Sequence, residues 1–412
     1  METGTLRRWL HPVGSSDVSD RRRNYLDNAA TSWPKAEAVY VAMDRYARDL
    51  GAAAGRGEYQ AAIAASDIVA SCRRALMQSV NAADAKEIAF FSNGTAALNA
   101  AILGSLRPGD HVVVSAIEHN SVLRPLEALR ERGEIQLSMI PCDAMGRVDL
   151  DRMLDSIGAS TAMVALAHAS NVTGAVQDVA AIGSHLQDTQ TLFLCDAAQT
   201  LGYLAIDVRA LGIDLLAAPG HKGAGGPLGT AMLYASPKAQ SRLRPTIYGG
   251  TGSISESLKM PAQMPQMLEA GNLNVPAIAG WNAGLQHLRS LDAAAQASHL
   301  AGLCHRLSAA FVGFDRGWSA VGQSLPIASL VFDDVQPGLV GSLLDSEYAI
   351  EVRCGLHCAA WIHEPIREAA SQRSSRAAAS YQGTLRLSAG HFTTPAQIDA
   401  AASAIDDLLS EL

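Results

Sequence analysis

The chain has 412 residues, 48% of them hydrophobic, which is more apolar sequence than one ordinary core holds, so we expect one large domain and a smaller one. The formal net charge is -8 at pH 7, and this acidic balance argues against nucleic acid as a partner. No run of about 18 apolar residues occurs and no stretch of secretory length opens the chain, so we expect neither a membrane span nor a signal peptide.

Short apolar runs alternate with helical patterns in the first part of the chain. The runs predict strands at residues 88–91, 111–115, 163–167, 192–195, 215–217 and 230–234. Helical patterns intervene at residues 96–103, 123–132 and 179–187. This alternation predicts an α/β domain with a mostly parallel sheet, whose ligands gather in the loops at the carboxyl ends of the strands.

Beyond about residue 281 the pattern changes to longer helices and a few strands. Helices are predicted at residues 282–290, 293–312, 338–347 and 395–409, and strands at residues 328–332 and 384–388. We therefore expect an N-terminal segment (1–24), a large α/β domain (25–280) and a small α+β domain (281–412). Residues 368–380, rich in Ala, Ser and Arg, fit either a helix or a loop.

Lys222 and Asp196 follow two of the predicted strands. A lysine in a protected site can lose its proton and form a Schiff base with an aldehyde cofactor, while the alternative is a surface lysine in a glycine turn. An acid at the end of a buried strand needs a positive partner, and a protonated pyridine nitrogen is one. A helix N-cap is the alternative for Asp196. Gln199 is positioned to donate to a ring oxygen.

Two further strand ends carry polar residues. Gly94 and Thr95 lie between a strand and a helix, where backbone N–H groups and a hydroxyl suit a phosphate; a plain glycine turn is the alternative. His119 follows another strand and could stack on a flat ring, shuttle a proton or serve a structural role.

Cys358 lies next to His357 and near Arg353, a setting that could depress the pKa of its thiol and make it a nucleophile. A buried inert cysteine is the alternative. Arg386 interrupts a strand-like run, where a forked guanidinium suits a substrate carboxylate. An edge-strand charge is the alternative for Arg386.

The cysteines suggest a reducing compartment. All six are scattered in a long chain, which is typical of free thiols in a cytoplasm rather than of a disulfide framework. His357 and His363 lie near Cys354 and Cys358, but no second cluster of ligands is evident, so we predict no metal.

Taken in order, these motifs resemble the fold-type I pyridoxal 5'-phosphate (PLP) enzymes, in the class V aminotransferase branch that contains cysteine desulfurases and selenocysteine lyases. The resemblance covers nearly the whole chain after the first two dozen residues. It predicts a fold-type I PLP-dependent transferase with a mostly parallel central sheet and a smaller α+β C-terminal domain. The matching motifs lie at residues 25–31, 55–57, 118–120, 168–171, 196–199, 220–222, 353–359 and 386–388.

The resemblance implies a role for each matching residue toward the cofactor. Lys222 would carry PLP and move protons at the substrate α-carbon. Asp196 would pair with the pyridine nitrogen, Gln199 with the ring hydroxyl, and His119 would stack on the ring. The residues implied at the phosphate are Gly94, Thr95 and His221, with Thr251 from a second subunit.

It also implies the substrate and the partners. Asn171 and Arg386 would bind the substrate carboxylate, and Arg353 would line the entrance with Arg56 from the other subunit. Cys358 would take sulfur from L-cysteine as a persulfide and leave L-alanine. The implied assembly is a homodimer with its active sites at the interface, and a separate sulfur-acceptor protein is left open.

Three departures from the family pattern keep other functions open. Pro219 stands where the family usually has Ser or Thr at the phosphate, Cys354 could accept sulfur or form a disulfide, and the stretch from Cys358 to Gly383 is long. A C–S lyase, a selenocysteine lyase or a biosynthetic aminotransferase is therefore the alternative reaction. A non-catalytic scaffold is a third hypothesis, against which the set of Lys222, Asp196 and His119 speaks.

Overall fold

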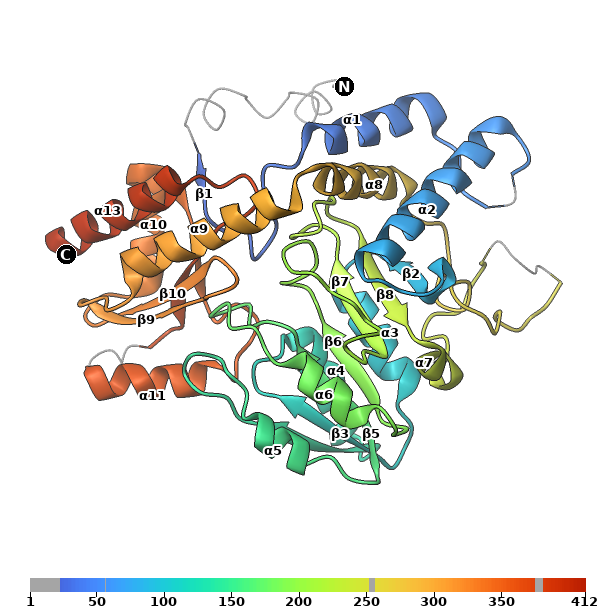
Figure 1. The fold of residues 1–412 in the computed structure, drawn as a ribbon, viewed down its shortest axis with the longest axis horizontal. Coiled ribbons are helices and arrows are strands. Elements are labelled where there is room, and N and C mark those ends of the chain that lie inside the picture. The colour runs from blue at the N-terminus through green and yellow to red at the C-terminus, as the bar shows by residue number, and fades with distance from the viewer. Residues whose placement is uncertain (1–22, 56, 252–255, 375–380) are drawn as a thin grey trace, which may run out of the picture.

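The chain folds into a large lobe and a small lobe, which Figure 1 shows on the right and on the left. The computed structural model describes residues 23–412 except 56, 252–255 and 375–380. Helix α8 (Val275–Ser290) lies over the large lobe, and α9 (Ala293–Phe311) continues from it into the small lobe.

The large lobe is built on a seven-stranded sheet with the order β2-β8-β7-β6-β5-β3-β4. Only β8 runs antiparallel to its neighbours in this sheet, which confirms the predicted mostly parallel sheet. Sequence analysis missed the edge strand β4, because its residues alternate in polarity and are only partly buried. The strands are β2 (Ile88–Phe91), β3 (Asp110–Ser115), β4 (Ile135–Ile140), β5 (Thr161–Ala167), β6 (Leu192–Asp196), β7 (Leu215–Pro219) and β8 (Ala231–Ala235).

Helices cover both faces of this sheet, as in other parallel sheets. Successive strand residues enter opposite cores: Phe193 packs in one and Leu194 in the other. The helices of the first core are α2 (Gln60–Ser79), α5 (Leu150–Asp155), α6 (Val179–Leu186) and α8. Those of the second core are α3 (Gly94–Ser105), α4 (Asn120–Glu131) and α7 (Pro237–Arg242). Helix α1 (Glu37–Arg45) packs on α8.

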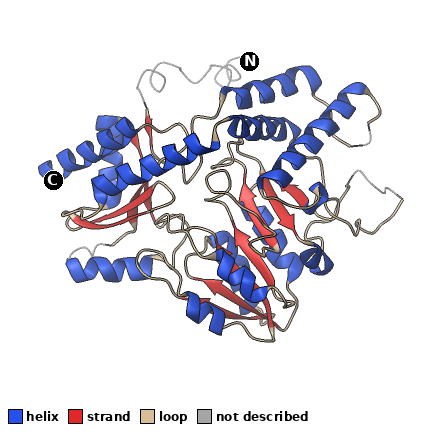
Figure 2. Cartoon of the chain, in the orientation of Figure 1, coloured by secondary structure: helices blue, strands red, loops and turns tan. Residues whose placement is uncertain are grey.

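The small lobe contains a four-stranded antiparallel sheet with the order β12-β13-β10-β9. One core joins this sheet to three helices, and α11 packs in a separate cluster around Val331. Figure 2 shows the sheet beside its helices. The elements are β9 (Gly317–Val321), β10 (Ile327–Phe332), β12 (Arg353–Gly355), β13 (Thr384–Ser388), α9, α10 (Pro337–Tyr348), α11 (His363–Arg373) and α13 (Pro395–Glu411).

The start of the described chain lies with the small lobe. Strand β1 (Asn24–Tyr25) pairs in parallel with β11 (Ile350–Glu351), and Asp27 bridges to Ser388. Arg386, two residues before Ser388, is thereby brought beside Asp27. We propose that the domain boundary expected at residue 280 lies after α8, because that helix is continuous to Ser290.

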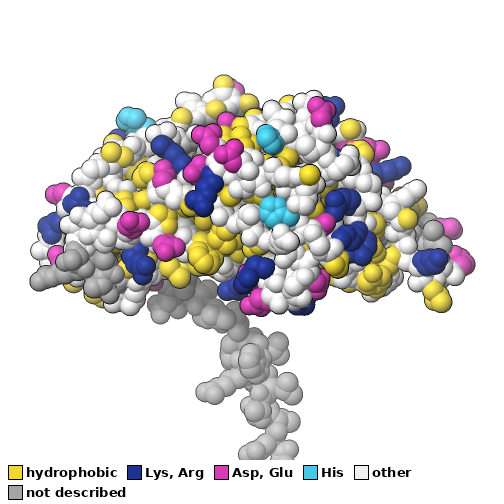
Figure 3. Space-filling model, turned by 90° about the horizontal axis from the view of Figure 1, so that it is seen from below, with side chains coloured by type: hydrophobic (Ala, Val, Ile, Leu, Met, Phe, Trp, Pro, Cys, Tyr) yellow, Lys and Arg dark blue, Asp and Glu magenta, His cyan; other side chains and the backbone are white. Residues whose placement is uncertain are grey.

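The long stretch after Cys358 contains a helix, α11, which begins at His363. Helix α11 ends at Arg373, and residues 375–380 lie outside the described part of the chain. None of the described helices combines the length and the apolar character needed to cross a membrane. On the face in Figure 3, Lys and Arg side chains lie among Asp and Glu side chains rather than in one stripe.

Candidate active site

One cavity brings together residues from the strand ends of the large sheet and from the loop after β12. Every predicted site residue lines it except Thr251 and Arg56. Thr251 lies outside the lining formed by this chain, and Arg56 lies outside the described residues. The lining includes Gly94, Thr95, His119, Asn171, Asp196, Gln199, His221, Lys222, Arg353, Cys358 and Arg386.

Asp196 and Lys222 lie where β6 and β7 end. Asp196 is buried and accepts a hydrogen bond from the Ala198 amide at 2.9 Å. Burial raises the pKa of Asp196, against the effect of that bond and of the charge on Lys222. Burial also lowers the pKa of Lys222 to about 8, although the charge of Asp196 opposes the change. A far larger fraction of the Lys222 amine is therefore neutral and nucleophilic near neutral pH than in an exposed lysine.

The loop that carries Lys222 is held from outside the large sheet. The carbonyl of His221 accepts from Ser32 N at 2.9 Å and from Lys35 Nζ at 2.6 Å. The carbonyl of Gly223 accepts from His391 Nε2 at 2.9 Å. Sequence analysis missed these contacts, because Lys35 and His391 are distant in sequence and carry no motif.

His119 and Thr95 lie at the starts of α4 and α3. The Ser121 hydroxyl is 2.8 Å from His119 Nδ1 and 2.7 Å from Thr95 Oγ1, so it connects the two. Burial, together with the charges of Lys222 and Arg353, lowers the pKa of His119 to about 4. Sequence analysis missed Ser121, although a hydroxyl two residues after a histidine at a helix start was a usable signal.

Glu118 joins the ends of β3 and β5 beneath the cavity. Its Oε1 accepts from Ser115 Oγ at 2.5 Å and from the Ala167 amide at 2.6 Å. Complete burial raises the pKa of Glu118 to about 8, so this carboxyl group is protonated at neutral pH. Sequence analysis placed Glu118 in a motif but assigned it no role.

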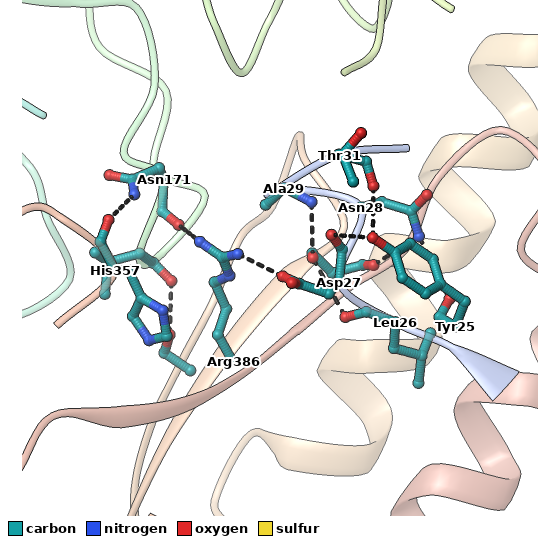
Figure 4. A network of polar contacts seen from close by, with 12 residues as sticks. Tyr25, Leu26, Asp27, Asn28, Ala29, Thr31, Asn171, His357 and Arg386 are labelled. Atoms are coloured by element: carbon teal, nitrogen blue, oxygen red, sulfur yellow. Dashed lines mark hydrogen bonds and ion pairs between the residues drawn. The ribbon is translucent and has the colours of Figure 1, made fainter. Parts of the chain in front are cut away.

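Arg386 is almost fully buried and reaches two groups from distant segments (Figure 4). Its guanidinium donates to Asp27 Oδ1 at 2.7 Å and to the Asn171 carbonyl at 2.9 Å. Within the described part of the chain, Arg386 Nε has no hydrogen-bond partner. Arg386 is thus a buried, cavity-lining cation with spare donor capacity. Asp27, its counter-charge, was missed by sequence analysis.

Cys358 lies on a loop with a fixed backbone. His357 and Cys358 have φ angles of 50° and 58°, in the left-handed region that non-glycine residues seldom adopt. Asn171 Nδ2 donates to the His357 carbonyl at 2.7 Å, and the Asn120 amide donates to the Cys358 carbonyl at 2.7 Å. His363 Nε2 lies 3.1 Å from the Leu356 carbonyl. These contacts hold the loop while the Cys358 side chain remains exposed.

His357 does not supply the positive charge that the sequence suggested. Its Nε2 lies 2.9 Å from Thr384 Oγ1, and burial lowers the pKa of His357 to about 2. The imidazole is therefore neutral at physiological pH, and its Nε2 is engaged by Thr384 on strand β13 of the small sheet. Arg353, which also lines the cavity, is the other group that the sequence placed near the Cys358 thiol, and it carries a positive charge.

Cys354 points away from the cavity. Its thiol donates to the Pro337 carbonyl at 3.1 Å and packs against the core of the small lobe beneath α10. Burial raises the pKa of Cys354 to about 11. All six cysteines are unpaired, so neither the disulfide nor a sulfur-accepting position is seen for Cys354.

The donor set of this cavity fits PLP. Asp196 is a buried carboxylate that could pair with a ring nitrogen, Lys222 is an amine for the aldehyde, and α3 begins beside Thr95. The buried Nδ1 of His221 has no hydrogen-bond partner among the described residues. The Gln199 amide donates to the Ala29 carbonyl at 3.1 Å and also lines the cavity. Within the described residues, no three His, Cys, Asp or Glu side chains group as metal ligands.

Known proteins are similar to this chain in sequence and in architecture. The family described as aminotransferase class V matches residues 24–401. A probable cysteine desulfurase of Methanothermobacter thermautotrophicus is 33% identical over 393 residues, which are 93% of this chain and 94% of that protein. A probable cysteine desulfurase of Pseudomonas putida is 33% identical and covers 82% of this chain and 85% of its own.

Solved structures of cysteine desulfurases are similar in fold to this chain. The apo structure of a cysteine desulfurase from Thermococcus onnurineus has a TM-score of 0.85 at 26% identity, covering 94% of this chain and 95% of that one. A cysteine desulfurase from Escherichia coli has a TM-score of 0.82 at 26% identity and covers 95% of each chain. The fold predicted from the sequence is confirmed.

Proposed function

The chain belongs to the class V aminotransferase family, and from that premise we propose that it is a PLP-dependent cysteine desulfurase. It would convert L-cysteine to L-alanine and keep the sulfur as a persulfide on Cys358. The observation that carries this proposal is that Cys358, Lys222 and Arg386 line the same cavity. This places a thiol, an amine with a lowered pKa and a buried guanidinium around one substrate-sized space.

PLP, when bound, supplies an electron sink for bond changes at the substrate carbon. We propose that Lys222 binds its aldehyde, Asp196 its ring nitrogen and Gln199 its ring oxygen, with His119 against the ring. The phosphate would lie at the start of α3, near Gly94, Thr95 and His221. The side chain of Pro219 offers no hydroxyl to the phosphate, so Thr95 would carry more of the phosphate contact.

The substrate carboxylate would pair with Arg386, whose free Nε and burial make it a strong anion partner. Asn171 and Arg353 would orient the substrate beside it. The neutral amine of Lys222 would take the proton from the substrate α-carbon and return it later.

Sulfur transfer would take place at Cys358. Its thiolate attacks the substrate sulfur, so that an S–S bond forms while the C–S bond breaks. The electron pair of the broken bond stays with the substrate carbon, which takes up a proton and leaves as alanine. The persulfide lies at an exposed position, where an external thiol or an acceptor protein can collect the sulfur.

The test is to incubate the PLP-loaded enzyme with L-cysteine and a thiol reductant and to measure alanine, sulfide and pyruvate together. Cys358→Ala should keep the visible absorbance of lysine-bound PLP and lose both sulfide and alanine. Cys354→Ala is the matched control and should retain both products. Undiminished sulfide from Cys358→Ala would overturn the persulfide role, and pyruvate in place of alanine would indicate a C–S lyase.

We further propose a homodimer in which Thr251 and Arg56 of one subunit complete the site of the other. Large apolar side chains lie exposed near Thr251, with Tyr248 74% and Ile247 61% accessible, which supports a covered interface there. Light scattering should report a dimer. Mixing inactive Lys222→Ala and Arg56→Ala subunits should restore part of the activity, since one site in each mixed dimer would be intact.

We propose a cytoplasmic location, because all six cysteines are unpaired and the reaction requires a free thiol at Cys358. The acceptor that collects sulfur from the Cys358 persulfide would be a thiol-bearing partner. Fractionation of the source cells, followed by detection of the protein with an antibody, would test the location.

A further inference from the structure

The first turn of α4 directs its backbone amides at two cavity residues. The Asn120 amide donates to the Cys358 carbonyl at 2.7 Å, and the Ser121 amide donates to His119 Nδ1 at 3.0 Å. The next two amides donate to the His119 carbonyl. Three of the four amides that this helix start leaves without an internal partner, those of Asn120, Ser121 and Val122, are therefore satisfied, and the imidazole of His119 serves as the side-chain cap.

This cap fixes which nitrogen of His119 carries the proton. A backbone amide can only donate, so His119 Nδ1 must be an acceptor and carries no proton. In the neutral imidazole the proton is then on Nε2. Nδ1 faces α4, which leaves Nε2 as the ring nitrogen available to the cavity that His119 lines.

The hydroxyl of Ser121 adds a second restraint on the same atom. Because Nδ1 accepts, the hydroxyl at 2.8 Å must donate to it. The oxygen of Ser121 is then free to accept from Thr95 Oγ1 at 2.7 Å. Ser121 thus connects the start of α3 to the ring of His119, and it is itself buried.

The surroundings oppose a charge on this ring from every side. Lys222 follows β7, Arg353 lies on β12 and Arg124 lies on α4 itself, and each lowers the pKa of His119, after burial as the main cause. The positive end of the α4 dipole acts in the same direction. Among the described residues, the charges that shift the pKa of His119 are all positive.

We propose that the start of α4 holds His119 as the neutral Nε2–H tautomer, with the amide of Ser121 fixing the tautomer and the Ser121 hydroxyl restraining the ring, so that His119 gives the cavity a hydrogen-bond donor and takes up no proton during turnover. Neither ring nitrogen can accept a proton without breaking this arrangement: Nε2 already carries one, and Nδ1 faces two donors. Proton uptake from the substrate is then left to Lys222. This last step rests on the proposed function, whereas the tautomer does not.

The test is nitrogen NMR of the PLP-loaded protein labelled with ¹⁵N-histidine, with the His119 signals assigned by their absence in His119→Asn. We expect Nδ1 to show the shift of an unprotonated nitrogen and Nε2 that of a protonated one, unchanged between about pH 6 and 9. A protonated Nδ1, or a titration of either signal in this range, would overturn the proposal.

Two variants separate the contacts. Ser121→Ala keeps the amide and loses the hydroxyl, so it should retain the tautomer while the His119 signals broaden; Ser121→Thr should restore the wild-type spectrum. Ser121→Pro removes the amide at a helix position that tolerates proline, and it should allow a protonated Nδ1. If Ser121→Pro does not fold, the wild-type and Ser121→Ala spectra still decide the question.

The outcome is distinguishable from failure of the proposed function. A protein that releases no sulfide from cysteine yet shows the fixed Nε2–H form would refute desulfuration and leave this proposal standing. A protein that releases sulfide while His119 titrates near neutral pH would support desulfuration and refute the proposed tautomer.

Discussion

The two ends of the cavity are built in different ways. At the Lys222 end, Asp196 is the last residue of β6 and Lys222 follows the adjacent strand β7, so neighbouring strands set their positions. At the Cys358 end, the thiol lies on a loop with left-handed residues, held by Asn171, Asn120 and His363. One end depends on sheet geometry and the other on contacts between distant segments.

This difference has a functional consequence. A cofactor must keep one position through every step, and parallel strands provide a rigid frame for it. The thiol must meet the substrate inside the cavity and an acceptor outside it, which suits an exposed loop. Figure 4 shows that Arg386 lies between Asp27 and Asn171, and Asn171 in turn holds the carbonyl of His357 on the cysteine loop.

The largest effect should come from Lys222→Ala, which removes the amine at the first end alone. We expect the visible absorbance of lysine-bound PLP to disappear and turnover to fall on the order of 10⁴-fold or more, since both the anchor and the proton-transfer group are lost. The reactivity of Cys358 toward a thiol reagent should not change. Lys86→Ala, at an exposed site, is the control, and a comparable loss there would contradict the assignment.

Arg386→Lys should have the next largest effect, because Arg386 serves both ends. Lysine keeps the charge but not the fork, so KM for cysteine should rise by about 10- to 100-fold while the PLP spectrum is retained. Asp27→Asn should instead lower stability, since it leaves a buried guanidinium without its counter-charge. Steady-state kinetics and urea unfolding distinguish the two variants, and an unchanged KM in Arg386→Lys would remove Arg386 from the substrate site.

Glu118→Gln tests the frame beneath the cofactor end through pH. The pKa of Glu118 is raised from 4.5 to about 8, so between these values the unfolded chain has lost a proton that the folded chain keeps. The free energy of unfolding should therefore fall as pH rises through this window and level off above about 8. Glu118→Gln removes this contribution, and urea midpoints at about pH 5 and about pH 8 should then differ less than in the wild type. An unchanged difference would show that Glu118 is ionised in the folded protein.

The same contrast explains what the sequence could predict. Asp196, His119, Thr95 and Lys222 were found because each follows an apolar run that local patterning identifies as a strand. Asp27 is 359 positions from its partner Arg386, and no local pattern connects them.

The cysteine loop shows the same limit. The residues around Cys358 identified it as a candidate nucleophile. The imidazole of the neighbouring His357, however, contacts Thr384, which lies 27 positions further along the chain. Edge strand β4 escaped because partial burial leaves no continuous apolar run. Short-range periodicity therefore predicts the frame of this protein, whereas pairings between segments distant in sequence require the fold.

The smallest effect should come from Tyr381→Phe, which touches the Cys358 end alone. The Tyr381 hydroxyl lies 2.5 Å from Nδ1 of His363, whose other nitrogen contacts the Leu356 carbonyl on the cysteine loop. Losing this one hydrogen bond should cost about 0.5–1.5 kcal/mol, so single-turnover formation of the Cys358 persulfide should slow only a few-fold. The PLP spectrum should not change, because no cofactor-end residue is involved. Tyr348→Phe, at the far end of α10, is the control, and a shifted PLP spectrum in Tyr381→Phe would show that the two ends are coupled.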